Sequence, residues 1–136
     1  MMHNLTHTVT FGDCDPAGIV FYPNSFRWMD ACFHDMLARA GGHAGLCKEI
    51  GSVGIGLADA SAQFRSPMMD RDALSIRLLG IEWGARALTA RYETCVGERL
   101  CFTGTEVRCI FKKTDKGISA DTTDALRALL EERLNG

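Results

Sequence analysis

The fold of this chain is decided by one stretch, Phe11-Gly12-Asp13-Cys14-Asp15-Pro16-Ala17-Gly18-Ile19-Val20-Phe21-Tyr22-Pro23-Asn24. It follows a segment rich in threonine and valine, Thr6 to Phe11, that is typical of a β-strand. Pro23 suits the first position of a helix, because its missing N–H is not needed there. The stretch therefore predicts a strand, an acidic loop and a helix N-terminus. Such an arrangement brings carboxylates near unpaired backbone N–H groups, which serves both carbonyl chemistry and ligand binding.

A long helix is predicted from Asn24 to about Ala40. Its apolar residues fall at positions 26, 29, 33, 36, 37 and 40, the spacing of one helical face. Asp30 projects about 40° from Phe26, at the edge of this face. A carboxylate there is expected to be partly buried and to need a partner. Gly41 and Gly42 end the helix, and residues 45 to 51 are predicted to form a loop or an irregular turn.

Four strands and a second helix are predicted in the rest of the chain. The strands cover residues 53–64, 74–83, 88–96 and about 98–111, and an amphipathic helix with a threonine N-cap covers 122–134. No linker or repeat interrupts this order, so residues 1–136 are expected to form a single domain. Successive strands after one helix favour an α+β fold in which an antiparallel sheet wraps around that helix.

Composition narrows the classes of function. The chain has 136 residues, of which 46% are hydrophobic, so it can bury one core. A net charge of −2 gives no basic field, so we expect no nucleic-acid partner. The chain has neither a signal-peptide pattern nor an apolar run of about 20 residues, so we expect a soluble, cytoplasmic protein without a membrane partner. The six scattered cysteines lack the spacing of a zinc site, so we expect reduced thiols and no metal.

The stretch from Asp13 to Asn24, followed by Phe26-Arg27-Trp28-Met29-Asp30, resembles the signature of the 4-hydroxybenzoyl-CoA thioesterase family. The similarity includes the Asp-Pro-Ala-Gly core at residues 15–18. Beyond about Ala31 it is limited to strand order, chain length and a Glu-Trp pair at positions 82 and 83. The family has the hotdog fold, an antiparallel sheet wrapped around a long central helix, so the resemblance implies a hotdog fold with a C-terminal helix. It also implies a homotetramer, a dimer of dimers with active sites at subunit interfaces.

The resemblance assigns catalytic roles to three residues of the loop. Asp15 is the catalytic carboxylate, acting as nucleophile or as general base toward water. The backbone N–H of Tyr22 polarises the thioester carbonyl, and Gly18 allows close approach. Other interpretations remain open, because an aspartate before a proline also caps turns. Asp13 is expected to bond loop amides and hold the turn.

The resemblance also predicts substrate-binding residues, namely Phe26, Asp30, Trp83 and Arg86. Asp30 would accept a hydrogen bond from a ring hydroxyl, although a structural acid bonded to a neighbour such as Arg27 is an equal alternative. Arg86 would bind CoA phosphates, with further basic candidates at Arg65, Lys112 and Lys113. The sequence departs from the founding members here, because its turn reads Gly84-Ala85-Arg86 where they carry several consecutive basic residues.

The function predicted from the sequence is hydrolysis of an aromatic acyl-CoA, hydroxybenzoyl-CoA or benzoyl-CoA, as in the degradation of aromatic compounds. No cofactor is expected, because a thioester is reactive enough to be hydrolysed without one. Two alternatives remain at this stage. One is a thioesterase for aliphatic acyl-CoA, and the other is a hotdog protein that binds acyl-CoA without hydrolysing it.

Overall fold

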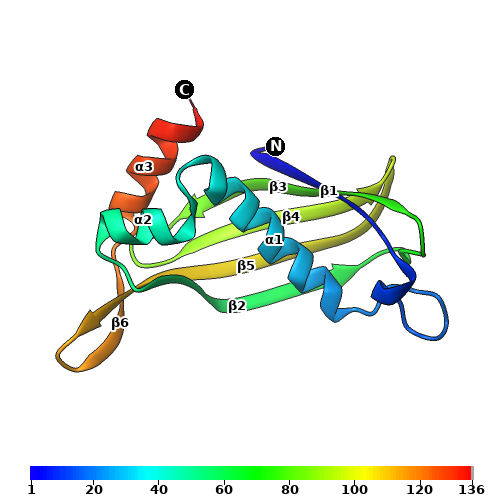
Figure 1. Cartoon of the computed structure of the whole chain (residues 1–136), viewed down its shortest axis with the longest axis horizontal. Coiled ribbons are helices and arrows are strands. Elements are labelled where there is room, and N and C mark those ends of the chain that lie inside the picture. Colours follow the sequence, from blue (N-terminus) through cyan, green and yellow to red (C-terminus); the bar gives the residue numbers. More distant parts are fainter. Residues whose placement is uncertain (136) are drawn as a thin grey trace. The chain divides into compact units, whose positions relative to one another are not determined.

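The computed structural model describes residues 1–135 and contains one six-stranded sheet. The strand order is β1-β3-β4-β5-β2, with β6 paired to β5 (Figure 1). The strands are β1 (His3–Thr8), β2 (Gly54–Phe64), β3 (Ala73–Trp83), β4 (Leu88–Val96), β5 (Arg99–Thr114) and β6 (Gly117–Asp121). The helices are α1 (Pro23–Arg39), α2 (Gly42–Ile50) and α3 (Asp124–Leu134), with a 3-10 turn η1 at Phe11–Asp13. The pairs β1–β3 and β5–β6 are antiparallel, and the predicted α+β class is confirmed.

The described residues fall into two compact units. Unit 1 comprises Met1–Phe33, Ala60–Gly80 and Arg91–Thr105. Unit 2 comprises His34–Asp59, Ile81–Ala90 and the residues from Glu106 onward. Unit 1 contains the whole acidic loop and the start of α1, so the candidate site is described within it.

In unit 1 the first part of α1 packs against β3 and β5. The Cys32 thiol donates to the backbone carbonyl of Ile76 at 3.5 Å. A Cβ placed on Gly104 would clash with the Met29 sulfur, so the helix side chain lies directly against the strand backbone. Met29 and Phe33 of the predicted apolar face are fully buried, and so is Cys32, whereas Phe26 of that face is half-buried. This packing anchors the N-terminus of α1 beside the acidic loop that precedes it.

The first strand lies earlier than the sequence predicted. It runs from His3 to Thr8, where it pairs with β3, instead of from Thr6 to Phe11. The chain then leaves the sheet because the Asp13 carboxylate accepts the backbone N–H of Thr10 at 2.9 Å. A side chain that bonds the backbone in this way competes with the hydrogen bonds of a sheet. The residues from Phe11 to Asp13 therefore form a 3-10 turn.

Residues 42–50 form a helix, α2, where a loop was predicted from residue 45. The glycines suggested a loop, but Leu46 and Cys47 are buried and tie the segment into the core of unit 2. Tertiary packing here outweighs the weak helix propensity of glycine. In Figure 1 α2 lies beside α3, and Arg133 of α3 binds Glu49 of α2 with an N–O distance of 2.6 Å.

Strand β6 was not predicted at all. Its five residues carry no apolar alternation, and Ile118 is 67% exposed. The strand exists because its backbone pairs with the end of β5, with Thr114 opposite Gly117. Within residues 1–135 no helix has the length and apolar character needed to cross a lipid bilayer.

Candidate active site

Backbone hydrogen bonds close the acidic loop between Cys14 and Val20, which form an isolated antiparallel bridge. The Asp15 N–H donates to the Ile19 carbonyl at 2.8 Å, and the Gly18 N–H donates to the Asp15 carbonyl at 2.9 Å. Gly18 has a φ of +81°, a conformation that favours glycine. The loop is therefore a tight turn that fixes the backbone of Asp15.

The carboxylate of Asp15 is half-buried and only partly engaged. Its Oδ1 accepts the N–H of Ala17 at 2.9 Å and that of Ile19 at 3.4 Å. No hydrogen bond from residues 1–135 reaches its Oδ2. Asp15 therefore caps the turn, and it also has an oxygen that a substrate or a water molecule can approach. The two interpretations of this residue are compatible.

Asp13 has a different environment from Asp15. Its Oδ2 lies 2.9 Å from both the Thr10 nitrogen and His7 Nε2. Partial burial alone would raise the pKa of Asp13, but the hydrogen bonds from Thr10 and His7 outweigh burial and hold it below its usual value. The His7 ring in turn contacts the Trp28 ring, with centroids 4.9 Å apart. Asp13 thus holds the turn, as the sequence predicted.

The thiol of Cys14 lies between the two aspartates in the sequence. Burial first, and then the negative charges of Asp70, Asp13 and Asp15, raise its pKa. The thiolate is the nucleophilic form of cysteine, so these charges disfavour a nucleophilic role for Cys14. Asp15 is therefore the better candidate for the reacting group in this loop.

The N-terminus of α1 presents an unpaired backbone donor at Tyr22. The N–H groups of Asn24 and Ser25 already donate to the carbonyls of Phe21 and Tyr22, each at 3.0 Å. The Tyr22 N–H donates to no residue among 1–135, and its ring is 61% exposed. The Asn24 side chain donates to the Asp13 carbonyl at 2.8 Å and so joins the helix to the acidic loop.

Beside this helix start lies a cavity of about 310 Å³. Its lining is mainly apolar and comes from the loop, the first turn of α1 and the segment that follows β2. The lining residues are Ile19, Val20, Tyr22, Ser25, Phe64, Arg65, Ser66, Pro67 and Met68. Mainly apolar cavities with a few polar groups are typical of ligand sites. The cavity therefore adds a candidate ligand site at the helix start, lined by residues of the same loop but not by Asp15.

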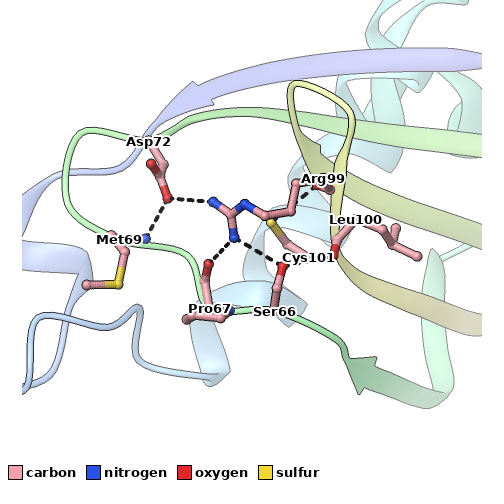
Figure 2. Close-up of polar contacts among 7 residues, drawn as sticks. All are labelled: Ser66, Pro67, Met69, Asp72, Arg99, Leu100 and Cys101. Carbon is pink, nitrogen blue, oxygen red and sulfur yellow. Dashed lines mark hydrogen bonds and ion pairs between the residues drawn. The ribbon is translucent and has the colours of Figure 1, made fainter.

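Arg99 contacts the segment that supplies Ser66 and Pro67 to the cavity lining, and Figure 2 shows these contacts. Its guanidinium donates to Ser66 Oγ at 3.1 Å and to the Pro67 carbonyl at 2.7 Å. The same group lies 3.5 Å from Asp72 Oδ2, which also accepts the N–H of Met69 at 2.8 Å. Arg99 thus holds both ends of the segment from residue 66 to residue 72.

The braced segment also contacts the acidic loop directly. The Val20 N–H donates to the Met68 carbonyl at 2.9 Å, and Ile19 and Met69 form an isolated antiparallel bridge. Asp15, Gly18 and Tyr22 therefore sit in a loop that is supported both by α1 and by this segment.

The predicted acyl-binding residues Phe26 and Asp30 lie one turn apart on α1, and both are half-buried. They belong to unit 1 together with Asp15, Gly18 and Tyr22. The partial burial expected for Asp30 at the edge of the apolar face is confirmed. Its role toward a substrate stays a prediction.

The predicted CoA-binding residues lie in unit 2. Trp83 ends β3 and is half-buried, while Arg86 is exposed and donates to the Ala120 carbonyl at 3.0 Å. Of the other basic candidates, Lys112 lies 3.7 Å from the Asp121 carboxylate. Arg65, in unit 1, donates to the Gln63 side chain at 3.1 Å. Each of these three cations therefore already has a polar partner.

Sequence reasoning did not single out three residues that shape this site, Asn24, Ser25 and Arg99. Asn24 carried a usable signal, because asparagine near a helix start commonly bonds the backbone there. Arg99 carried no such signal, because Ser66, to which it donates, lies 33 positions away from it in the chain. Within residues 1–135 no group of three or more His, Cys, Asp or Glu side chains is arranged to hold a metal ion.

Comparison with protein families gives a match to the thioesterase-like superfamily over residues 9–130. A curated relative, the 4-hydroxybenzoyl-CoA thioesterase of Pseudomonas sp. (strain CBS-3), is 34% identical over 86 residues. That alignment covers 62% of this chain and 61% of the relative. The matched segment thus spans less than two thirds of the relative's length.

Solved structures give a longer match. An aspartate-to-asparagine mutant of 4-hydroxybenzoyl-CoA thioesterase, complexed with 4-hydroxybenzoyl-CoA, has a TM-score of 0.79 and 26% identity, covering 93% of this chain and 98% of that one. The 4-hydroxybenzoyl-CoA thioesterase from Pseudomonas sp. strain CBS-3 has a TM-score of 0.77 and 28% identity, covering 91% and 96%. A gentisyl-coenzyme A thioesterase has a TM-score of 0.74 and 26% identity, covering 93% and 98%. These matches confirm the predicted hotdog fold.

Proposed function

Because the chain belongs to the thioesterase-like superfamily, as the sequence predicted, we propose that it hydrolyses an aromatic acyl-CoA, hydroxybenzoyl-CoA or benzoyl-CoA, to the aryl carboxylate and CoA. The observation that carries the proposal is a carboxylate with one unbonded oxygen, at Asp15, followed a few residues later by a backbone N–H at Tyr22 that donates to no described residue. The aromatic acyl group is inferred from the relatives, which are named for 4-hydroxybenzoyl-CoA and gentisyl-CoA.

In the proposed reaction, the Tyr22 N–H donates to the thioester carbonyl oxygen, on which negative charge develops. The positive end of the α1 dipole supports this charge. Asp15 acts by one of two routes. As a nucleophile, its free oxygen bonds to the carbonyl carbon, the carbon–sulfur bond breaks and the CoA thiolate leaves, after which water hydrolyses the mixed anhydride. As a general base, it takes a proton from the water that attacks the carbonyl carbon.

The remaining site residues have proposed roles in binding. Phe26 and Asp30 face the aryl group, where the Asp30 carboxylate accepts a hydrogen bond from a ring hydroxyl. Trp83 and Arg86 bind the CoA part, with Arg86 directed at phosphate. We further propose that the chain acts in the cytoplasm as one domain, assembled into a homotetramer whose active sites lie between subunits.

The test of this function is CoA release from 4-hydroxybenzoyl-CoA, 3-hydroxybenzoyl-CoA, benzoyl-CoA and decanoyl-CoA. We expect the highest kcat/KM on a hydroxylated aromatic substrate, and a loss of roughly 1,000-fold or more in kcat for Asp15→Asn with substrate binding retained. Preference for decanoyl-CoA would mean that the substrate is an aliphatic and not an aromatic acyl-CoA. Undiminished turnover by Asp15→Asn would mean that Asp15 takes no part in the mechanism.

The two routes for Asp15 are separated by a single turnover in water labelled with ¹⁸O. The nucleophilic route can leave the label in the Asp15 carboxylate, because water can attack the anhydride at either carbonyl. The general-base route places the label in the aryl carboxylate only. Mass spectrometry of the peptide that contains residues 13–24 distinguishes the two results.

A further inference from the structure

Ser25, in the first turn of α1, carries a buried hydroxyl that has no hydrogen-bond partner. The residue is 0% exposed, and its Oγ bonds to no atom of residues 1–135. Buried hydroxyls in native proteins are almost always paired, because an unpaired one costs free energy that a paired one does not. Helical serines usually relieve this cost by bonding the carbonyl one turn earlier, and Ser25 does not.

Ser25 also lines the cavity beside the helix start, together with Tyr22. Side chains on a helix lean toward its N-terminus, so the Ser25 hydroxyl lies over the turn that contains Tyr22. The Ser25 N–H already donates to the Tyr22 carbonyl at 3.0 Å, which leaves the Tyr22 N–H and the Ser25 hydroxyl as donors without partners in this turn. The two residues that carry these donors thus line one mainly apolar cavity at the positive end of a helix.

We propose that the Ser25 hydroxyl is a second donor to the thioester carbonyl oxygen, beside the Tyr22 N–H. This inference rests on the proposed thioesterase function and adds a catalytic residue to it. Oxyanion sites commonly use two donors, because a developing oxyanion can accept more than one hydrogen bond. Ser25 keeps its proton throughout, so it adds no proton-transfer step. In this proposal the hydroxyl of Ser25 has no partner in the free protein because its partner is the carbonyl oxygen of the substrate.

Thr94 supplies a matched control within the same unit. Its Oγ1 is also buried without a hydrogen-bond partner, but it lies in β4 and does not line the cavity. Thr94→Val removes a buried, unpaired hydroxyl of the same kind at a place outside this cavity. Loss of activity in Ser25→Ala but not in Thr94→Val therefore reports a contact with substrate and not a general effect of deleting a buried hydroxyl.

The experiment compares wild type, Ser25→Ala, Ser25→Cys and Thr94→Val on 4-hydroxybenzoyl-CoA, benzoyl-CoA and decanoyl-CoA. For Ser25→Ala we expect kcat to fall roughly 100-fold on every substrate that wild type hydrolyses, with little change in KM. The melting temperature should not fall, because the substitution removes an unpaired polar group from the interior. Ser25→Cys keeps the shape but is a weak donor, so it should lose most of the same activity even if Ser25→Ala folds poorly.

A direct readout is the infrared stretching frequency of a ¹³C-labelled thioester carbonyl bound to Asp15→Asn. Adding Ser25→Ala should raise this frequency toward its value in an aprotic solvent, because the carbonyl loses one hydrogen-bond donor. Unchanged kcat, an unchanged carbonyl frequency, or a loss confined to the hydroxylated substrate would overturn the role of Ser25 while leaving the thioesterase intact. Inactivity of wild type on all of the substrates would instead overturn the proposed function.

Discussion

Asp13 and Asp15, which are separated by one residue in the acidic loop, have different hydrogen-bond partners. Asp13 is bonded on one oxygen by both Thr10 and His7, so its charge is used to hold the turn. Asp15 bonds the backbone amides of its own turn through one oxygen and leaves the other open. The structural role of Asp13 agrees with the sequence analysis, in which the first aspartate was expected to bond loop amides, whereas a chemical role for Asp15 stays a prediction.

The lowered pKa of Asp13 predicts a pH-dependent contribution to stability. Its folded-state pKa lies below the usual value of 3.8, so the ionised side chain stabilises the native state above that value, and the effect is lost as the pH falls through the folded-state pKa. Asp13→Asn should therefore lower the free energy of unfolding by roughly 1 kcal/mol at pH 7. The difference from wild type should shrink steadily in urea titrations below about pH 4.

Asp59 is the control for this measurement, because it is an exposed aspartate in β2 and lies outside the acidic loop. Asp59→Asn should leave the unfolding free energy nearly unchanged across the same pH range. A constant deficit of Asp13→Asn down to pH 2.5 would show that the asparagine disturbs the turn by something other than its missing charge.

Arg99, at the start of β5, holds the segment from residue 66 to residue 72 in position. Arg99→Ala removes the bonds to Ser66, Pro67 and Asp72 and frees the cavity wall. We expect kcat/KM for acyl-CoA to fall roughly tenfold, because small displacements of a binding wall cost catalytic geometry. Because the Arg99 side chain is 43% exposed, the loss of stability should be modest, about 1 kcal/mol.

Two variants separate geometry from charge at this brace. Arg99→Lys keeps the charge near Asp72 but lacks the planar fork, so it should recover only part of the activity. Arg71→Ala removes an exposed arginine of the same segment and should leave steady-state kinetics unchanged. Equal activity of Arg99→Ala and wild type would mean that the segment keeps its position without the brace.

The elements that the sequence predicted well are those with a strong local pattern. Helix α1 runs from Pro23 to Arg39, within one residue of the prediction, because its apolar spacing and its glycine stop are both local signals. The helix α2 and the strand β6 were missed because contacts that their own sequence patterns do not show create them, namely the burial of Leu46 and Cys47 for α2 and backbone pairing with β5 for β6. The cavity wall was missed for the same reason, since the bonds of Arg99 join residues far apart in sequence.

Strand β5 contains a buried ion pair, from which we predict a large effect of one substitution on stability. The Arg108 guanidinium contacts the Glu106 carboxylate at 3.1 Å, and both side chains are almost fully buried. Glu106→Gln keeps the shape but removes the negative charge that the buried Arg108 guanidinium contacts, so it should lower the free energy of unfolding by roughly 3–5 kcal/mol. Chemical denaturation measures this loss.

The control for the buried pair is the pair of Arg127 and Glu131 on α3, where both side chains are about half exposed. Glu131→Gln should cost less than about 1 kcal/mol, because solvent screens the exposed pair. A similar small cost for both variants would indicate that other contacts compensate the Arg108 charge when Glu106 is neutral.

The matched family model spans residues 9–130, so the acidic loop and every strand from β2 to β6 fall within it. The fold could therefore be predicted from the loop signature and the order of elements. The substrate could not, because the aryl-binding residues that set it are few and their roles depend on a bound acyl group. The cavity and the unpaired donor at Ser25 emerged only from the structure.

The proposed homotetramer can be tested at the exposed edge of the sheet. Strand β2 is the last in the sheet order, so one of its edges has no neighbouring strand among the described residues, and its Leu57 is 46% exposed. An unpaired edge with apolar side chains favours pairing with a second copy of the chain. Analytical ultracentrifugation of wild type should give four times the 14.9 kDa chain mass. Leu57→Glu should give smaller species with reduced activity, whereas Ile118→Glu, at an exposed residue of β6, should not. A wild-type monomer that retains full activity would overturn both the assembly and the placement of the active sites between subunits.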